Sequence, residues 1–200
     1  MAYTTLPPEY SPHAIRWTRD DCAKLEQAGF LTEQYELVEG VIIKVGQNMP
    51  HAALIMLILE WVLEVFTRSY VVTQASIDVR PEDNPTNEPM PDILVLARPA
   101  ISFKERARPS DIRLLIEASD STIRYDLTTK ARLYARAGIV EYWVVSLPDR
   151  TLTVHRDPQD GLYQDVTTYM ENEQAASLAA PGNIVRVSQL LPNPDEYPIN

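Results

Sequence analysis

Hydrophobic and polar positions follow two patterns along this chain, and both predict strands. Continuous apolar runs are typical of strands buried in the middle of a sheet. The chain has three such runs, at 92–97, 113–118 and 141–146. Shorter β-branched or alternating segments indicate further strands. These segments lie within 35–45 and 70–80, and at 151–156 and 162–168, where edge strands are expected.

Three helices are predicted between these strands, each starting at or just after a residue that caps helix N-termini well. They span 18–28, 49–67 and 121–137. The helix 49–67 is apolar nearly all round, so we expect it to be covered on two sides. Helices interleaved with strands in this order predict an α/β fold, in which helices flank a mixed central β-sheet.

The 200 residues fit one domain with an irregular arm at its start. Residues 1–17 contain three prolines and form the predicted N-terminal arm. Residues 18–200 form the domain, and its last part is an acidic C-terminal extension with one exposed-looking apolar patch at 184–191. With 45% hydrophobic residues, the chain can bury a substantial core.

The composition favours a cytoplasmic protein without a membrane span. Cys22 is the single cysteine, so an intrachain disulfide is impossible and a packed thiol is expected. The first residues lack the basic and apolar segments of a signal peptide. Glu60 and Glu64 interrupt the longest apolar stretch, which is too short to cross a membrane.

The net charge of −10 weighs against nucleic-acid binding, which needs a basic contact surface. The distribution of charge reduces this objection. Residues 104–138 contain eight Lys or Arg and five acids, a net charge of +3 that leaves −13 for the remainder. The basic excess therefore coincides with the part of the chain that carries the candidate chemistry.

Three acids and a lysine are the candidate chemical groups. Asp92 opens one buried run and Glu117 ends another, so their carboxylates meet if the two strands are neighbours. Glu39 precedes a glycine turn, and Lys130 lies on the third helix. Carboxylates at strand ends bind Mg²⁺ or Mn²⁺, the Ala118 carbonyl can add an oxygen ligand, and an ammonium stabilises charge on a phosphate.

Several stretches together resemble the PD-(D/E)XK nuclease superfamily and, within it, the Uma-type family of restriction endonucleases. They are YELVEG (35–40), PDILV (91–95), IEAS (116–119), STIRYDLTTK (121–130), LYARAG (133–138) and EYWVV (141–145). The resemblance covers about residues 18–155 in order. It implies a restriction-endonuclease-like fold in which Glu39, Asp92 and Glu117 are metal-site acids and Lys130 is the catalytic lysine.

Three positions refine the resemblance. Ser119 occupies the superfamily's usual lysine position, and the Uma-type pattern moves the lysine to the following helix. Asp120 replaces a proline that is common in the family and adds a negative charge near the site. His51 matches a frequent family histidine, for which hydrogen bonding or phosphate contact is a more suitable role than metal binding.

The same residues also have purely structural interpretations. Glu39 is then a solvated turn acid, and Lys130 forms an ordinary helical ion pair with Asp126, four residues earlier. Tyr134 and Trp143 are interpreted as core residues. For Glu117 the functional interpretation leads, because a buried carboxylate is costly unless it is paired or metal-bound.

The leading hypothesis is a Mg²⁺- or Mn²⁺-dependent endonuclease that hydrolyses DNA. The predicted substrate contacts are His51, Arg124, Lys104, Arg106 and Arg108. The alternative is a catalytically inactive nuclease-fold module that binds protein or nucleic acid. A homodimer is also predicted, with the helix 52–66 and the patch 184–191 as candidate seams.

Overall fold

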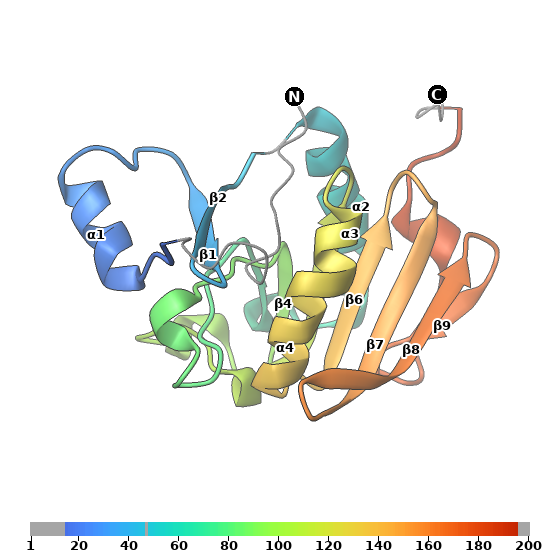
Figure 1. Ribbon diagram of the computed structural model, residues 1–200. Coiled ribbons are helices and arrows are strands. Elements are labelled where there is room, and N and C mark those ends of the chain that lie inside the picture. Colours follow the sequence, from blue (N-terminus) through green and yellow to red (C-terminus); the bar gives the residue numbers. More distant parts are fainter. Residues whose placement is uncertain (1–14, 47, 196–200) are drawn as a thin grey trace.

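A six-stranded mixed sheet forms the centre of the computed structural model, which describes residues 15–46 and 48–195 (Figure 1). In spatial order the strands are Val71–Thr73 (β3), Ile93–Leu96 (β4), Ile112–Ser119 (β5), Glu141–Ser146 (β6), Thr151–Gln159 (β7) and Leu162–Met170 (β8). Only β5 and β6 are parallel, and the other neighbours are antiparallel. A parallel pair needs a crossover, and here a helix provides it.

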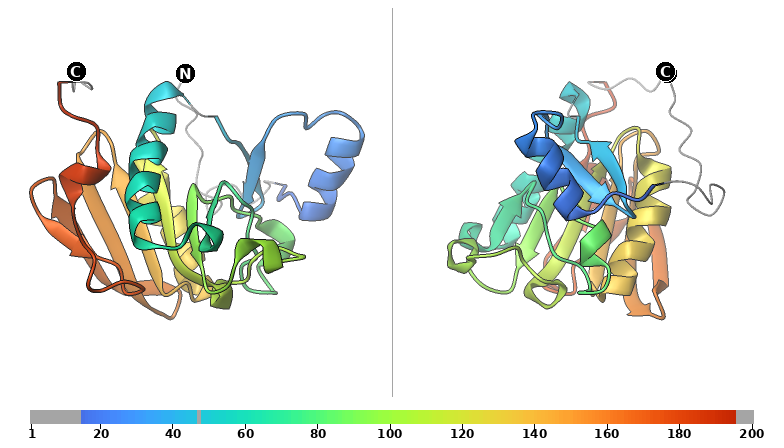
Figure 2. Two further views of the ribbon diagram at one scale, coloured as in Figure 1. Left: turned by 180° about the vertical axis from the view of Figure 1, so that it is seen from behind. Right: turned by 60° about the vertical axis from the view of Figure 1, so that its left-hand side comes forward.

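Helices cover both faces of this sheet (Figure 2). The long helix α2 (Met49–Val65) packs on one face, against a core that includes Ile93, Ile116 and Trp143. The crossover helix packs on the opposite face. It consists of α3 (Ile123–Tyr125), a π-helical turn (Asp126–Lys130) and α4 (Ala131–Ala137). This arrangement confirms the predicted mixed sheet with flanking helices.

A hairpin and a short helix lie beside the sheet at its β3 side (Figure 1). They are α1 (Arg19–Gln27), β1 (Tyr35–Val38) and β2 (Val41–Lys44). Leu37 of β1 and Glu88 exchange backbone hydrogen bonds of 3.2 and 2.6 Å, which fix the hairpin to the loop before β4. In the hairpin turn Glu39 and Gly40 have φ values of 51° and 74°, the left-handed conformation that two-residue hairpins require.

The C-terminal segment folds back onto the α2 face. It forms β9 (Gln174–Ala176) and β10 (Ile184–Arg186), and the side chains of Val185, Val187, Leu190 and Leu191 are buried in the core beneath α2. The prediction of an exposed apolar patch at 184–191 was therefore wrong, although Ile184 itself is exposed. Such alternation is what a short strand lying on a core produces.

The buried carboxylate of Glu141 fastens this segment to the sheet. Ser177 Oγ and the Leu178 N–H donate to Glu141 Oε2 at 2.6 and 2.9 Å. Arg156 and the Trp143 indole donate to Oε1 at 2.6 and 3.1 Å. With this many donors, a fully buried acid is satisfied without any ligand. Glu141 is therefore a structural residue.

Shorter elements lie between the main helices and strands. The segment 70–80, where one or two strands were expected, contains one, β3; beyond Thr73 its backbone bonds to loops. Short 3₁₀ turns, not anticipated, span Arg68–Tyr70, Asn84–Thr86, Ala100–Ser102, Pro109–Asp111 and Val187–Leu190. The predicted arm 1–17 lies mostly outside the described residues. Cys22 is a buried free thiol, as expected.

The helix α2 is covered on one side only. Met49, Met56 and Leu63 recur at seven-residue spacing and are 82%, 63% and 40% exposed. The expectation of burial on two sides was wrong, because the sheet and the C-terminal segment both pack on the same side of α2 and leave these three residues exposed. Within residues 15–46 and 48–195, no helix is both long and apolar enough to cross a membrane.

Candidate functional site

The carboxylates of Asp92 and Glu117 lie side by side at one end of the sheet. Ile93 of β4 pairs with Ile116 of β5, so the next position on each strand brings Asp92 opposite Glu117. Both face away from the Ile93–Ile116 layer, toward the crossover helix. Asp92 Oδ2 accepts a hydrogen bond from the Ala118 N–H at 2.8 Å, which ties the two strand ends together. The predicted adjacency of these acids is thus present in the fold.

Lys130 extends its ammonium group into a cluster of buried carboxylates. Its Nζ lies 3.0 Å from Glu117 Oε1, 3.1 Å from Glu36 Oε2 and 3.9 Å from Asp126 Oδ1. Burial disfavours the charged amine, but the neighbouring Glu117 and Glu36 outweigh burial and raise the pKa of Lys130 well above its ordinary value. Lys130 is therefore a cation at neutral pH.

Burial acts in the opposite direction on the acids. It raises the pKa of Glu117 well above its ordinary value, and the nearby ammonium of Lys130 opposes that rise. Burial likewise raises the pKa of Asp126. The cluster therefore concentrates negative charge in a space where a carboxylate is expensive unless a cation accompanies it.

Glu36, which sequence reasoning passed over, occupies the place expected for Glu39. Strand β1 directs alternate residues to the same face, and Val38 on that face packs against Leu133 of α4. Glu36 therefore also points toward the helix that carries Lys130. Its position within a strand, between Tyr35 and Leu37, was the signal available in the sequence.

Glu39 instead lies at the hairpin tip, outside the cluster. Its carboxylate pairs with Arg136 near the end of α4, and Arg136 also binds Asp83 at 2.9 Å. The Glu39 N–H donates to Asn87 Oδ1 at 2.7 Å. The structure does not bring Glu39 to Lys130, because a two-residue turn points its side chain outward while the strand before it faces inward.

A π-helical turn interrupts the helix that was predicted as continuous over 121–137. It spans Asp126–Lys130 and turns both side chains toward the sheet. The Tyr142 hydroxyl donates to the Asp126 carbonyl at 3.0 Å. Asp126 Oδ2 accepts from Ser119 Oγ at 2.8 Å and from Thr122 Oγ1 at 2.6 Å. Ser119 thus holds the acid that lies beside Lys130.

Two of the clustered carboxylates are engaged mainly through one oxygen. Glu117 Oε1 accepts from Lys130 and from the Tyr134 hydroxyl at 2.9 Å. Glu36 Oε2 accepts from the Met90 N–H at 3.2 Å and lies beside Lys130. Among the described residues, no donor reaches Glu117 Oε2 or Glu36 Oε1. Within that part of the chain, each acid thus has one oxygen without a donor.

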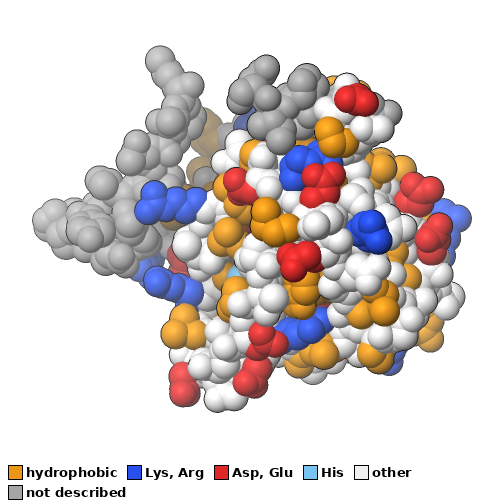
Figure 3. Space-filling view, turned by 90° about the vertical axis from the view of Figure 1, so that its right-hand side faces the viewer, with side chains coloured by type: hydrophobic (Ala, Val, Ile, Leu, Met, Phe, Trp, Pro, Cys, Tyr) orange, Lys and Arg blue, Asp and Glu red, His pale blue; other side chains and the backbone are white. Residues whose placement is uncertain are grey.

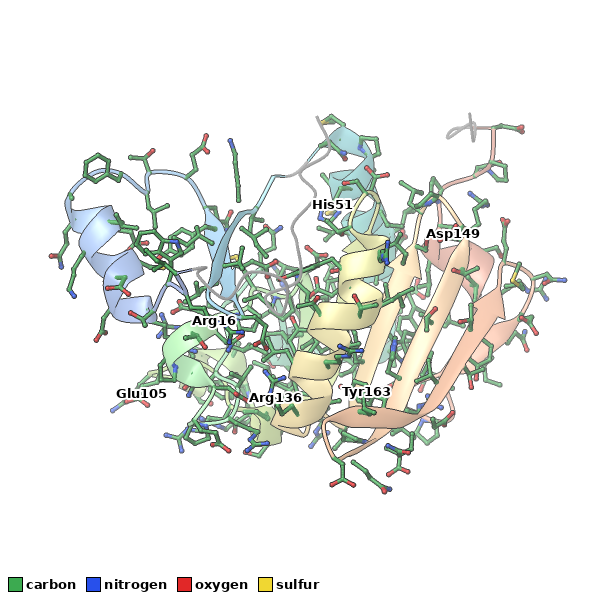
Figure 4. All side chains as sticks on the ribbon, viewed as in Figure 1. Arg16, His51, Glu105, Arg136, Asp149 and Tyr163 are labelled. Atoms are coloured by element: carbon green, nitrogen blue, oxygen red, sulfur yellow. The ribbon has the colours of Figure 1, made fainter. Side chains whose placement is uncertain are left out.

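His51 borders the cluster from the start of α2 (Figure 4). Asn48 caps this helix by accepting from the His51 N–H at 2.8 Å. His51 Nε2 lies 3.3 Å from Asp92 Oδ1, and this hydrogen bond raises the pKa of His51. Asp120 accepts from Asn48 Nδ2 at 2.8 Å, so the acid that replaces the family's proline joins the α2 N-terminus to the loop after β5.

The predicted basic loop lies at the other end of the sheet. Because β4 and β5 are antiparallel, the loop 97–111 between them leaves at the end opposite Asp92 and Glu117. Glu105, within this loop, and His51 are far apart in Figure 4. Arg106 pairs with Glu88 and Arg108 with Glu105, whereas Lys104 is exposed. The structure therefore does not bring Lys104, Arg106 and Arg108 to the carboxylates.

Of the basic residues predicted to contact substrate, Arg124 lies at the same end of the sheet as the carboxylates. It is exposed on α3, directly after the loop that follows β5.

The face that carries the C-terminal strands shows basic and acidic side chains interspersed with hydrophobic ones (Figure 3). Charge on that face is thus mixed, which does not favour a phosphate backbone.

The donor set fits a hard divalent cation. Four carboxylates (Glu36, Asp92, Glu117 and Asp126) surround one ammonium and one histidine, so the cluster has an excess of negative charge. Oxygen ligands of this kind are those that Mg²⁺ and Mn²⁺ prefer. In the described part of the chain, no three His, Cys, Asp or Glu side chains form a ready-made metal centre. A cation here would use Glu117 Oε2, which no described donor reaches, and would share or replace the contact between Asp92 Oδ1 and His51.

Comparisons with known proteins show the fold and the family of this chain. The solved structure of a “putative nuclease belonging to DUF820” from Anabaena variabilis has the same fold, with a TM-score of 0.65 and 17% sequence identity. The match covers 86% of this chain and 96% of that one. No curated protein matches the chain. A family model matches residues 24–188. Because this match spans most of the sequence, the chain belongs to the Uma2 family, described as “Putative restriction endonuclease”.

Proposed function

We propose that this protein is a metal-dependent endonuclease that hydrolyses phosphodiester bonds of DNA. The observation that carries the proposal is the buried ammonium of Lys130 between Glu36 and Glu117, next to Asp92 at the same sheet end. Membership of a family described as restriction endonucleases supports the reaction class. The carboxylate cluster supports the metal dependence.

Asp92 and Glu117 would hold Mg²⁺ or Mn²⁺, with the Ala118 carbonyl as a further oxygen ligand and Glu36 as the third acid. When bound, such a cation polarises the phosphate and favours ionisation of a water molecule. The surrounding protein limits the access of bulk water, since Glu36, Asp92 and Glu117 are all buried residues. Low local polarity strengthens every electrostatic interaction with the phosphate.

Lys130 acts as a cation and not as a base. Its raised pKa keeps the amine protonated, so it donates hydrogen bonds that orient the attacking water and stabilises charge developing on the phosphate. In this proposal His51, whose Nε2 lies 3.3 Å from Asp92 Oδ1, would turn to a phosphate oxygen when DNA binds, and Arg124, exposed at the same end of the sheet, would contact the DNA backbone. Contacts of this kind bind DNA without choosing a sequence.

The homodimer remains a prediction, and only one of its two candidate surfaces is still available. Of the two apolar surfaces considered, the patch 184–191 is buried and the outer face of α2 is exposed. Two active sites in one dimer would suit cleavage of both strands of a duplex. Light scattering that shows only monomer at micromolar concentration would remove this expectation.

The proposal is tested by incubating purified protein with plasmid DNA in Mg²⁺ or Mn²⁺. We expect nicking or linearisation by the wild type, and a loss of about 100-fold or more in Asp92→Ala and Glu117→Ala, because each removes an oxygen ligand. Glu105→Ala is the matched control, since Glu105 is an exposed acid at the far end of the sheet. A wild type that cuts nothing, or site variants that cut equally well, would contradict the proposal.

One observation favours the alternative function, an inactive nuclease-fold binding module. The basic loop lies away from the cluster, and Arg106 within it is paired with Glu88. Calorimetry distinguishes the two functions. An active enzyme binds Mn²⁺ with measurable heat that Asp92→Ala removes, whereas an inactive module of this kind gives no metal heat.

A further inference from the structure

Tyr134 is both a core residue and a hydrogen-bond donor to the carboxylate cluster. Its ring is fully buried and packs edge-on against Tyr142, with centroids 5.0 Å apart, as a core residue would. Its hydroxyl, however, donates to Glu117 Oε1 at 2.9 Å. Tyr134 lies one helical turn after Lys130, so the same helix face supplies two donors to one carboxylate oxygen.

Two donors on one oxygen fix the orientation of the carboxylate. Lys130 alone is shared between Glu117 and Glu36, so its single contact leaves the plane of the Glu117 carboxylate free to rotate. The Tyr134 hydroxyl donates a second hydrogen bond, which restricts rotation of the carboxylate. Its ring is fully packed, so the position of the hydroxyl is fixed. Burial and the charge of Glu117 raise the pKa of Tyr134 well above its ordinary value, so the hydroxyl keeps its proton.

The other oxygen of Glu117 is then presented in a defined position. Within the described chain Oε2 has no hydrogen-bond donor, and it lies on the carboxylate adjacent to Asp92. A partner that holds one oxygen so that the other is free is the usual arrangement around metal-binding carboxylates. The contact pattern of Tyr134 is therefore that of a residue acting through Glu117.

We propose that Tyr134 is a positioning residue that holds Glu117 Oε1 and thereby presents Oε2 to a divalent cation. The proposal rests on the metal-dependent function proposed above. It adds to that function the residue that holds one ligand, Glu117, in a fixed orientation. This residue, Tyr134, lies on the same helix as Lys130.

The first test is calorimetric titration of Mn²⁺ into Tyr134→Phe, with no DNA present. Loss of the hydroxyl keeps the ring packing and is expected to weaken Mn²⁺ affinity by about 10- to 100-fold. Tyr163→Phe is the matched control, since Tyr163 packs partly buried against the same core and its hydroxyl donates to the Ile139 carbonyl, at 2.9 Å, and not to a clustered acid. We expect its Mn²⁺ affinity to equal that of the wild type. Equal affinities in the wild type and Tyr134→Phe would overturn the proposal.

A second test needs no metal and separates this proposal from the function on which it rests. Urea denaturation is compared for Tyr134→Phe in the wild-type background and in Glu117→Ala. We expect the substitution to lower the denaturation midpoint only in the wild-type background, because without Glu117 the hydroxyl has lost its acceptor. An equal decrease in both backgrounds would show a core role only. If the wild type binds no Mn²⁺, the proposed function fails, whereas the Tyr134–Glu117 coupling is still decided by this comparison.

Discussion

Lys130→Met is expected to reduce DNA cleavage by about 100- to 1,000-fold, the range for removing one donor that stabilises developing charge. The same change is expected to lower the free energy of unfolding by about 3–5 kcal/mol, because it leaves buried acids without their cation. Methionine retains the length and packing of the lysine stem, so the effect isolates the charge. Plasmid cleavage and urea denaturation measure the two losses.

The stability deficit of Lys130→Met should depend on pH in a defined direction. Burial raises the pKa of Glu117 above its ordinary value of 4.5, and Lys130 is the main group that opposes the rise. Without Lys130 the folded-state pKa rises further. A group with a raised pKa gives its full stabilisation below the unfolded value and loses it as pH rises through the folded value. The deficit should therefore be largest at neutral pH and shrink toward pH 4.5.

Lys24→Met is the control for both measurements. Lys24 is an exposed residue of α1 that pairs with Asp21 at 3.8 Å, so its removal should change stability by less than about 1 kcal/mol at any pH. Cleavage should be unchanged. If Lys130→Met behaved like Lys24→Met, or its deficit were the same at pH 5 as at pH 8 (roughly the range over which the shift should act), the buried charge cluster would not govern this site.

The second large effect is expected at Glu36 and not at Glu39. Glu36→Gln removes a negative charge 3.1 Å from the Lys130 amine and should reduce cleavage by about 100- to 1,000-fold. Glu39→Gln removes only a partly exposed ion pair with Arg136, so cleavage should change by less than about 3-fold and stability by less than about 1 kcal/mol. Both substitutions are isosteric and lie on one hairpin, which makes each the control for the other.

The plasmid assay with Mn²⁺ compares the two variants directly. A reversed result, in which Glu39→Gln is inactive and Glu36→Gln cuts normally, would show that the hairpin delivers its tip to the substrate and that the inward face of β1 is structural. Equal activity of both variants would remove the hairpin from the site altogether.

Part of this arrangement follows from the sequence. The apolar runs predict β4 and β5 correctly, and an acid at the start of one and the end of the other requires adjacency once the strands are antiparallel neighbours. The same topology also places the loop 97–111 at the far end, a deduction that counting charges along the chain does not supply. Linear charge density is thus a poor guide to which end of a sheet becomes basic.

Other parts depend on tertiary packing that no local pattern shows. The choice between Glu36 and Glu39 depends on which face of the hairpin meets α4, although the inward alternation of β1 gave a usable signal. The π-helical turn at Asp126–Lys130 is stabilised by Tyr142 from β6, a contact between distant segments. The sequence also could not predict the hydrogen bond of the Tyr134 hydroxyl. A tyrosine in an apolar context predicts a buried ring, and that burial does not show which group the hydroxyl contacts.

The central claim is that Asp92 and Glu117 bind a divalent cation beside the charged amine of Lys130. Anomalous diffraction from crystals soaked in Mn²⁺ tests it most directly. The predicted result is a single strong peak in direct contact with an Asp92 oxygen and Glu117 Oε2, while Glu117 Oε1 keeps its contacts to Lys130 and Tyr134. A map with no peak between these two acids, in crystals that bind Mn²⁺ elsewhere, would contradict the claim.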